Sequence, residues 1–149
     1  MNTFLSSYIA TALWSSMDDD GRPLDDNFRP DAIPAAELAK AETDCAAFQE
    51  ANATDLDLSK LSDDRAGHNL WLNRNGHGAG FWDEYSQTTC EANEREQTIA
   101  MGTRDFSKRD KLKETCNCPY HACERLSDAA RSLGSVDIYV GDDGHLYFS

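Results

Sequence analysis

Residues 119–148, PYHACERLSDAARSLGSVDIYVGDDGHLYF, contain a helical pattern that is followed directly by a strand pattern. The apolar residues at helical spacing are Leu126, Ala129, Ala130 and Leu133. Gly134 suits the left-handed cap that ends many helices. Apolar and polar residues then alternate over 136–140 and again over 146–148, with Gly-Asp-Asp-Gly between them. This stretch therefore predicts a helix over 119–133 and a C-terminal β-hairpin.

Two further helices are predicted closer to the N-terminus. Residues 3–16 and 34–51 both carry the apolar stripe of an amphipathic helix. The first stripe consists of Phe4, Leu5, Tyr8, Ile9, Ala12 and Leu13, and the second of Leu38, Ala41, Cys45 and Phe48. Pro34 suits the start of a helix, where its missing N–H costs nothing.

The middle of the chain changes its pattern. The alternation over 70–72, the Asn-Gly pair at 75–76 and the apolar residues over 79–82 predict a second hairpin. Residues 84–118 are polar and carry clusters of charge. We expect them to form an exposed excursion with one short helix, either mobile or anchored by a metal.

Together these patterns predict a single α+β domain that spans residues 1–149. About three helices would pack on a small antiparallel sheet that includes the C-terminal β-hairpin. The chain has 149 residues, of which 40% are hydrophobic, and this is enough for one core.

The chain is strongly acidic, with 27 Asp and Glu against 14 Lys and Arg and a formal net charge of -13. This charge argues against direct binding of nucleic acid over the whole surface. No apolar run approaches the ~18 residues of a membrane span, and the N-terminus lacks a secretory signal pattern. We therefore expect a cytoplasmic protein that does not bind a membrane.

The acidic residues gather in the first half of the chain, where residues 1–66 hold 14 acids and 5 bases. They either form a solvated surface that keeps the protein soluble or bind a partner with a basic surface, in the extreme case by imitating the phosphates of DNA. The candidate partner-binding residues are Asp18, Asp19, Asp20, Asp25, Asp26, Asp55, Asp57, Asp63 and Asp64. A local basic stretch over 104–113 could instead contact the acidic half of a second copy and form a homo-oligomer.

Residues 73–83 hold three glycines at alternate positions, Gly76, Gly78 and Gly80. One interpretation is a tight hairpin turn, and the other is a loop whose bare backbone cradles a small anionic or nucleotide-like ligand. The candidate ligand-binding residues are Arg74, His77, Gly78, Trp82 and Asp83, with the first two supplying charge, Trp82 a stacking face and Asp83 orientation. The segment is neither a P-loop nor a dinucleotide-binding fingerprint.

Four residues with soft ligand atoms lie within eight positions, namely Cys116, Cys118, His121 and Cys123. Thiolates and imidazole are the ligands that zinc prefers, although this spacing is not that of a common zinc finger. Reduced cysteines at the start of a helix, with a reactive Cys118, are the alternative. Cys90 lies upstream in the polar excursion, and the odd total of five cysteines disfavours a disulfide framework.

Residues 68–83 (HNLWLNRNGHGAGFWD) and 136–144 (VDIYVGDDG) resemble the small, acidic accessory proteins that tailed bacteriophages and prophages encode. In that group the Phe-Trp-Asp motif passes quickly into a helix similar to residues 125–130, so the polar excursion and its cysteines look like an addition here. The resemblance implies a phage origin and the cytoplasm of a bacterial host, and it supplies no catalytic residue.

The sequence therefore favours an accessory protein that binds and modulates a host protein with a basic surface, in its strongest form as a DNA mimic acting on a nucleic-acid-handling or defence enzyme. Two alternatives stay open. One is a small-molecule-binding protein or enzyme centred on residues 73–83. The other is an interaction module that structural zinc stabilises.

Overall fold

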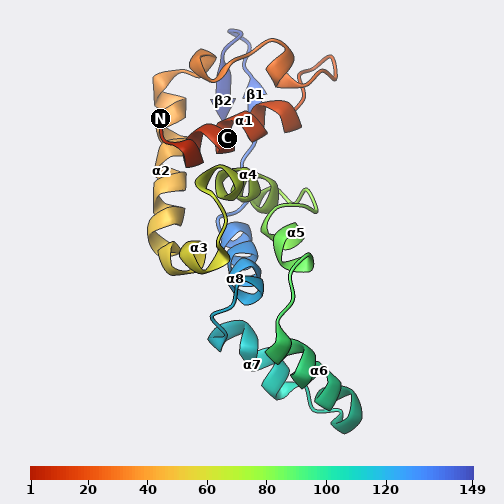
Figure 1. The fold of residues 1–149 in the computed structure, drawn as a ribbon. Helices are drawn as coiled ribbons and strands as arrows, with labels where there is room; N and C mark the ends of the chain where they lie inside the picture. The colour runs from red at the N-terminus through yellow and green to blue at the C-terminus, as the bar shows by residue number, and fades with distance from the viewer.

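The protein, described over all 149 residues by a computed structural model, is predominantly helical (Figure 1). Its helices are α1 (Thr3–Ser15), α2 (Ala35–Ala51), α3 (Ala53–Ser59), α4 (Asp63–Arg74), α5 (Phe81–Ser86), α6 (Glu91–Thr103), α7 (Ser107–Thr115) and α8 (Pro119–Ser132), with short 3-10 helices at Leu24–Asp26 and Pro30–Ala32. The only sheet pairs β1 (Ile138–Val140) with β2 (Leu146–Phe148) in antiparallel register. The prediction of an α+β domain with about three helices on a sheet is therefore wrong.

The helices predicted at both ends of the chain are confirmed, as is the terminal hairpin. α1, α2 and α8 begin and end within two residues of their predicted bounds. Local capping explains this agreement, because the Asn2 side chain accepts a hydrogen bond from the Leu5 N–H and Pro119 opens α8. Gly134 follows α8 with a φ of 77°, as a left-handed helix cap requires.

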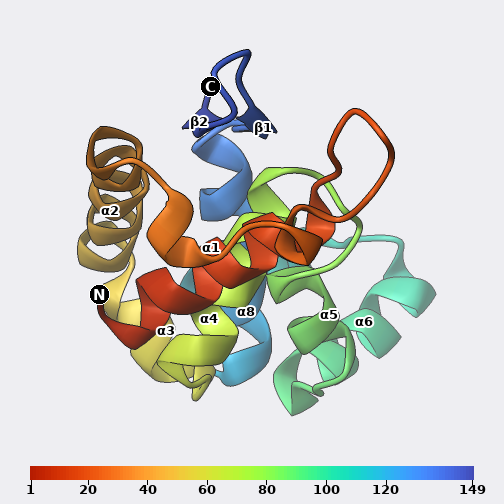
Figure 2. The ribbon, with the colours of Figure 1, turned by 90° about the horizontal axis from the view of Figure 1, so that it is seen from above.

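The hairpin predicted over 70–82 is wrong, because α4 continues through residues 70–72 and α5 begins at Phe81. The Asn75-Gly76 pair does turn the chain, but it connects two helices. Every residue from 69 to 74 is buried, since α4 lies between α1 and α8 (Figures 1 and 2). A helix that is buried on most of its circumference loses its amphipathic period, so a short apolar run there is easily taken for a strand.

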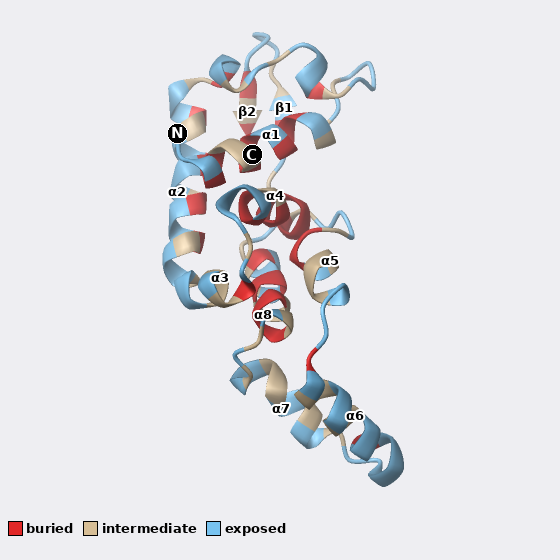
Figure 3. Ribbon diagram, in the orientation of Figure 1, coloured by how far each residue is buried: buried red, intermediate tan, exposed pale blue.

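The core lies where α1 crosses α4. A methyl group on Gly67 would lie 2.1 Å from the carbonyl oxygen of Phe4, so only glycine permits this close approach of the two backbones. The Trp71 ring is buried next to it, with its edge against Tyr8 and its Nε1–H donating to the Ser15 hydroxyl at 2.8 Å. Buried positions are concentrated on α1, α4 and α8 (Figure 3).

Residues 84–118 hold more structure than the single short helix that the sequence predicts. α6 and α7 form a helical hairpin, here called the lobe (residues 90–116), which projects from the rest of the molecule, the body (Figure 1). Most of the lobe is exposed (Figure 3), and only Cys90 and Ala100 are buried in it. The lobe therefore has almost no hydrophobic core of its own.

The terminal hairpin packs on the opposite end of the body. The Glu37 carboxylate of α2 accepts hydrogen bonds from the Phe148 N–H at 2.8 Å and from Lys40 Nζ at 2.9 Å. Lys40 also donates to the Phe148 carbonyl oxygen at 3.2 Å. None of the helices combines the length and the apolar character that crossing a lipid bilayer requires.

Candidate metal centre

Four potential metal ligands meet at the base of the lobe. The ligand atoms of Cys90, Cys116, Cys118 and His121 all lie within 4.8 Å of one another. Cys90 immediately precedes α6 and Cys116 immediately follows α7, so these two residues mark the two ends of the lobe. Cys118 and His121 belong to the start of α8. The cluster therefore brings both ends of the lobe to the start of α8.

The start of α8 positions two of the ligands. Cys118 is the N-cap residue, and its sulfur accepts the His121 N–H at 3.4 Å. Because the two residues are three positions apart, their side chains lie on the same side of the first turn, with the sulfur 3.1 Å from His121 Nδ1. Cys116 and Cys118 both have extended backbone, and this brings two side chains separated by one residue to the same side of the chain.

The distance between the sulfurs of Cys90 and Cys116 is the one expected in a tetrahedral metal site. Cys90 Sγ and Cys116 Sγ lie 3.8 Å apart, much too far for a disulfide bond. Four ligands arranged tetrahedrally around zinc, with zinc–sulfur bonds of about 2.3 Å, place thiolate sulfurs about 3.8 Å apart. The three thiols and one imidazole are therefore close enough together to hold a metal ion.

Burial and neighbouring groups shift the pKa values of three of the four potential ligands. Burial raises the pKa of the Cys118 thiol to about 11. Burial also opposes ionisation of Cys116, but hydrogen bonds from Cys118 and Cys90 and the charge of Arg125 outweigh it and lower the pKa of Cys116. Burial, and then the charge of Arg125, lower the pKa of His121, which keeps its ring neutral as a metal ligand must be.

Arg125, which belongs to α8, holds the loop that carries Cys116. Its Nη1 donates to the carbonyl oxygens of Lys113 at 2.8 Å and Cys116 at 2.9 Å. Its Nε and Nη2 donate hydrogen bonds of 2.9 to 3.2 Å to the Asp55 carboxylate of α3. One side chain thus ties the loop that carries Cys116 to two helices of the body, in the manner of the outer shell of a metal site.

The sequence predicted Cys123 as the fourth ligand, and the structure brings Cys90 there instead. Cys123 follows His121 by two positions, which is about 200° around a helix, so its side chain lies on the opposite face of α8. There it is 1% exposed, and burial raises its pKa to about 11. The available signal was the helix beginning at Pro119, because its periodicity turns Cys123 away from His121 and requires a ligand from another segment.

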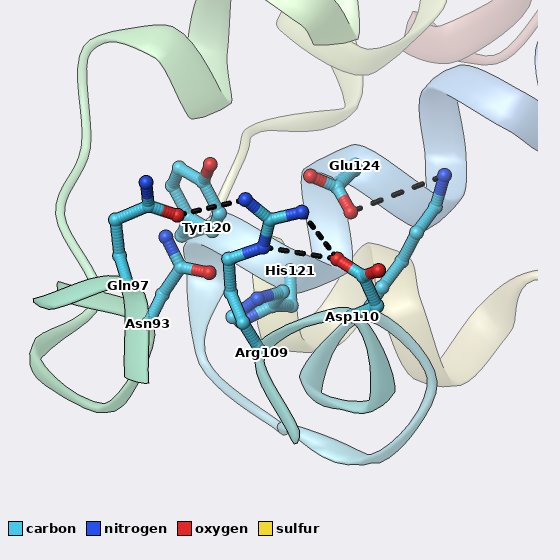
Figure 4. Close-up of a pocket in the computed structure, with 8 residues that line it drawn as sticks. Asn93, Gln97, Arg109, Asp110, Tyr120, His121 and Glu124 are labelled. Carbon is cyan, nitrogen blue, oxygen red and sulfur yellow. Dashed lines mark hydrogen bonds and ion pairs between the residues drawn. The ribbon is translucent and has the colours of Figure 1, made fainter. Parts of the chain in front are cut away.

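A polar cavity of about 350 Å³ lies between α6, α7 and α8, with His121 in its wall (Figure 4). Arg109 spans it, donating to Gln97 Oε1 at 2.7 Å and to the Asp110 carboxylate. Lys113 forms an ion pair with Asp128 of α8 at 2.6 Å. This ion pair joins the lobe to the body on the surface, and such exposed pairs contribute little to stability.

The structure separates the residues predicted around the glycine segment. Arg74 is buried and donates to the Tyr8 hydroxyl, the Asp44 carboxylate and the Gly134 carbonyl oxygen. The Asp83 carboxylate accepts the Gly80 N–H at 3.2 Å. Three different cavities are lined by Arg74, by His77, and by Gly78 together with Trp82. Arg74 and His77 therefore do not share a site with Trp82.

The acidic residues of the first half are also divided. The loop that carries Asp18, Asp19 and Asp20 and helix α3, with Asp55 and Asp57, lie on opposite sides of the body (Figures 1 and 2). Several of these carboxylates have structural roles. Asp18 accepts the Asp20 and Arg22 N–H groups at 2.9 Å each, and Asp55 pairs with Arg125. Asp63 and Asp64 occupy the first turn of α4, where negative charge stabilises a helix, and Asp25 and Asp26 lie in the 3-10 helix Leu24–Asp26.

The ligand pattern of the metal centre is Cys-x-Cys-x2-His, with Cys90 added from 26 residues before Cys116. No protein-family model, no curated protein and no solved structure matches the chain.

Proposed function

We propose that the protein is a binding module in which structural zinc, held by Cys90, Cys116, Cys118 and His121, fixes the lobe on the body. The observation that carries this proposal is the convergence of four ligand atoms, from both ends of the lobe and from α8, within 4.8 Å. Three thiolates and one imidazole are a typical zinc set, and four protein ligands leave no open position for substrate. This favours a structural over a catalytic role for the ion.

The composition of the lobe explains why it needs a metal. With two buried residues it cannot gain enough from hydrophobic burial to offset the entropy lost on ordering. Binding of zinc to a preformed set of thiolates contributes folding free energy directly. A lobe fixed in this way presents an exposed, charged surface that a partner can recognise without first ordering it.

Elemental analysis tests the proposal. Protein purified under reducing conditions without added metal is expected to contain one zinc per chain by plasma mass spectrometry and native mass spectrometry. Cys90→Ser and Cys116→Ser should lose the ion, whereas Cys45→Ala and Cys123→Ala, which change buried cysteines outside the cluster, should keep it. A folded, reduced protein without zinc would contradict the proposal, as would retention of zinc after substitution of Cys90.

A second proposal concerns the partner, which would be a protein with a basic surface. The net charge of -13 and the exposed carboxylates of the loop around Asp19 support it, because opposite charge accelerates association. The resemblance to phage accessory proteins would make that partner a protein of the bacterial host. Association of the protein with this basic partner should weaken steeply as the salt concentration rises. A double variant, Asp19→Asn and Asp20→Asn, should associate more slowly. Salt-independent binding, or unchanged association by the double variant, would contradict this.

A further inference from the structure

We propose that the glycine loop, residues 76–80, forms a binding site for a small molecule that carries an anionic group next to a planar ring, of the nucleoside monophosphate class. The loop borders a cavity of about 370 Å³ between the start of α5 and the end of α8. The lining residues are Asn73, Gly76, Gly78, Ala79, Trp82 and Arg131. The volume is within the range of small-molecule sites.

Contacts with α4 hold the end of the loop where α5 begins. Asn73, which is 4% exposed, accepts the Trp82 N–H at 3.3 Å through Oδ1 and donates to the Ser127 hydroxyl at 3.1 Å through Nδ2. Gly80 has a φ of 114°, and a methyl group there would lie 2.7 Å from the Asn69 carbonyl oxygen. Only glycine fits that position, so this end of the loop packs directly against the backbone of α4.

Two consecutive backbone donors in the cavity wall are available to an anion. The N–H groups of Gly76, His77 and Gly80 all donate within the protein. Those of Gly78 and Ala79 have no partner in the protein, and Gly78 has a φ of 71°. Successive N–H groups in a loop with left-handed residues form concavities that bind anions.

Arg131 places a cation in the same wall. Its only ion pair is with Asp128 at 3.6 Å, and Asp128 is already bound more closely by Lys113 at 2.6 Å. The guanidinium is thus held weakly and can turn to a phosphate, for which its planar donors are well suited. Asp128 and the net charge of -13 disfavour ligands with a large negative charge, and this favours a monophosphate over the more highly charged triphosphate.

Trp82 supplies the stacking surface. Its side chain lines the cavity and is 43% exposed, unlike the buried Trp71. The edge-on contact with Tyr85, at 6.1 Å between ring centroids, fixes one side of the indole. The exposed part of the indole is the surface on which we propose that the base stacks, because bases stack readily on exposed aromatic side chains.

The experiment is titration of the isotopically labelled protein with AMP, GMP, CMP and UMP by NMR and calorimetry. At least one is expected to bind saturably with a Kd below about 1 mM, with shifts at the Gly78 and Ala79 amides. Arg131→Gln and Trp82→Leu should each weaken binding about tenfold. The controls Arg95→Gln and Trp14→Leu change an exposed arginine and a half-exposed tryptophan elsewhere and should leave the affinity unchanged.

Inorganic phosphate and the free nucleosides serve as separate probes. Weaker binding of both than of the nucleotide supports the combined site, whereas equal affinity for phosphate alone overturns the assignment of the ring. Absence of saturation by all four nucleotides, or unchanged binding by Arg131→Gln and Trp82→Leu, overturns the site. The test does not involve the proposed zinc, because Arg131 belongs to the last turn of α8 and the metal ligands to its beginning.

Discussion

The guanidinium of Arg125 donates a hydrogen bond of 2.9 Å to the carbonyl oxygen of Cys116, the residue that ends the lobe. The same guanidinium forms an ion pair with Asp55 of α3. The peptide group that orients one ligand is therefore fixed by the body, and the position of Cys116 depends on a residue that provides no ligand atom.

Replacing Arg125 by Gln is expected to lower the affinity for zinc by about 10- to 100-fold, because the loop that carries Cys116 loses its support. Competition with a chelator of known affinity measures the effect. Arg95→Gln on the exposed surface of α6 is the matched control and should bind zinc as the unmodified protein does. If Arg125→Gln binds zinc with unchanged affinity, the position of Cys116 does not depend on Arg125.

Removal of the metal should release the lobe and leave the body folded. The lobe has only Cys90 and Ala100 buried, whereas α1, α4 and α8 form the continuous core. Hydrogen exchange of the Cys90→Ser variant, or of the protein with chelator, is expected to accelerate strongly in α6 and α7 and little in α4. Equal protection of the lobe with and without metal would contradict this expectation.

Substitution of Gly67 by Ala tests the crossing of α1 and α4. The added methyl group would meet the Phe4 carbonyl oxygen at 2.1 Å, so the helices must separate at a cost of about 1–3 kcal/mol or more. Gly102→Ala is the matched control, because Gly102 is also helical and nothing lies within 4 Å of its added methyl group. Urea unfolding should show a lower midpoint for the first variant and an unchanged or higher midpoint for the second.

The elements that the sequence predicts correctly are those with local signals. α1, α2 and α8 have one apolar face and a defined start, and the terminal hairpin has a clear turn. α4 has no such contrast, since Leu70, Trp71 and Leu72 are all enclosed by other helices, and its burial depends on contacts that are distant in sequence. The α6–α7 hairpin buries only Cys90 and Ala100, and without an apolar stripe its sequence offers little sign of two packed helices.

The same distinction applies to the metal centre. Cys116, Cys118 and His121 are neighbours in the chain, so their density alone indicates a site. Cys90 lies beside them only because the two ends of the lobe, 26 residues apart in sequence, meet in space. That meeting depends on the packing of α6 against α7. Local density can therefore indicate a metal site without identifying its complete ligand set.

Acid should weaken the attachment of the terminal hairpin through Glu37. The hydrogen bonds from Lys40, and then from the Phe148 N–H, lower the pKa of Glu37 below its ordinary value of 4.5. A carboxyl group whose pKa is lower in the folded state stabilises the fold above the unfolded pKa and loses this contribution as the pH falls through the folded value. The unmodified protein should therefore exceed Glu37→Gln in stability at pH 7, and the difference should shrink as the pH falls below about 4.5.

Glu42→Gln, which changes an exposed acid on the same helix, is the control for general charge. Urea unfolding at each pH gives the free energies of unfolding. At a sufficiently low pH, the Glu37 carboxyl group is protonated in both the folded and the unfolded protein. If the stability difference between Glu37→Gln and the unmodified protein stays constant down to that pH, Glu37 acts through packing and not through its charge.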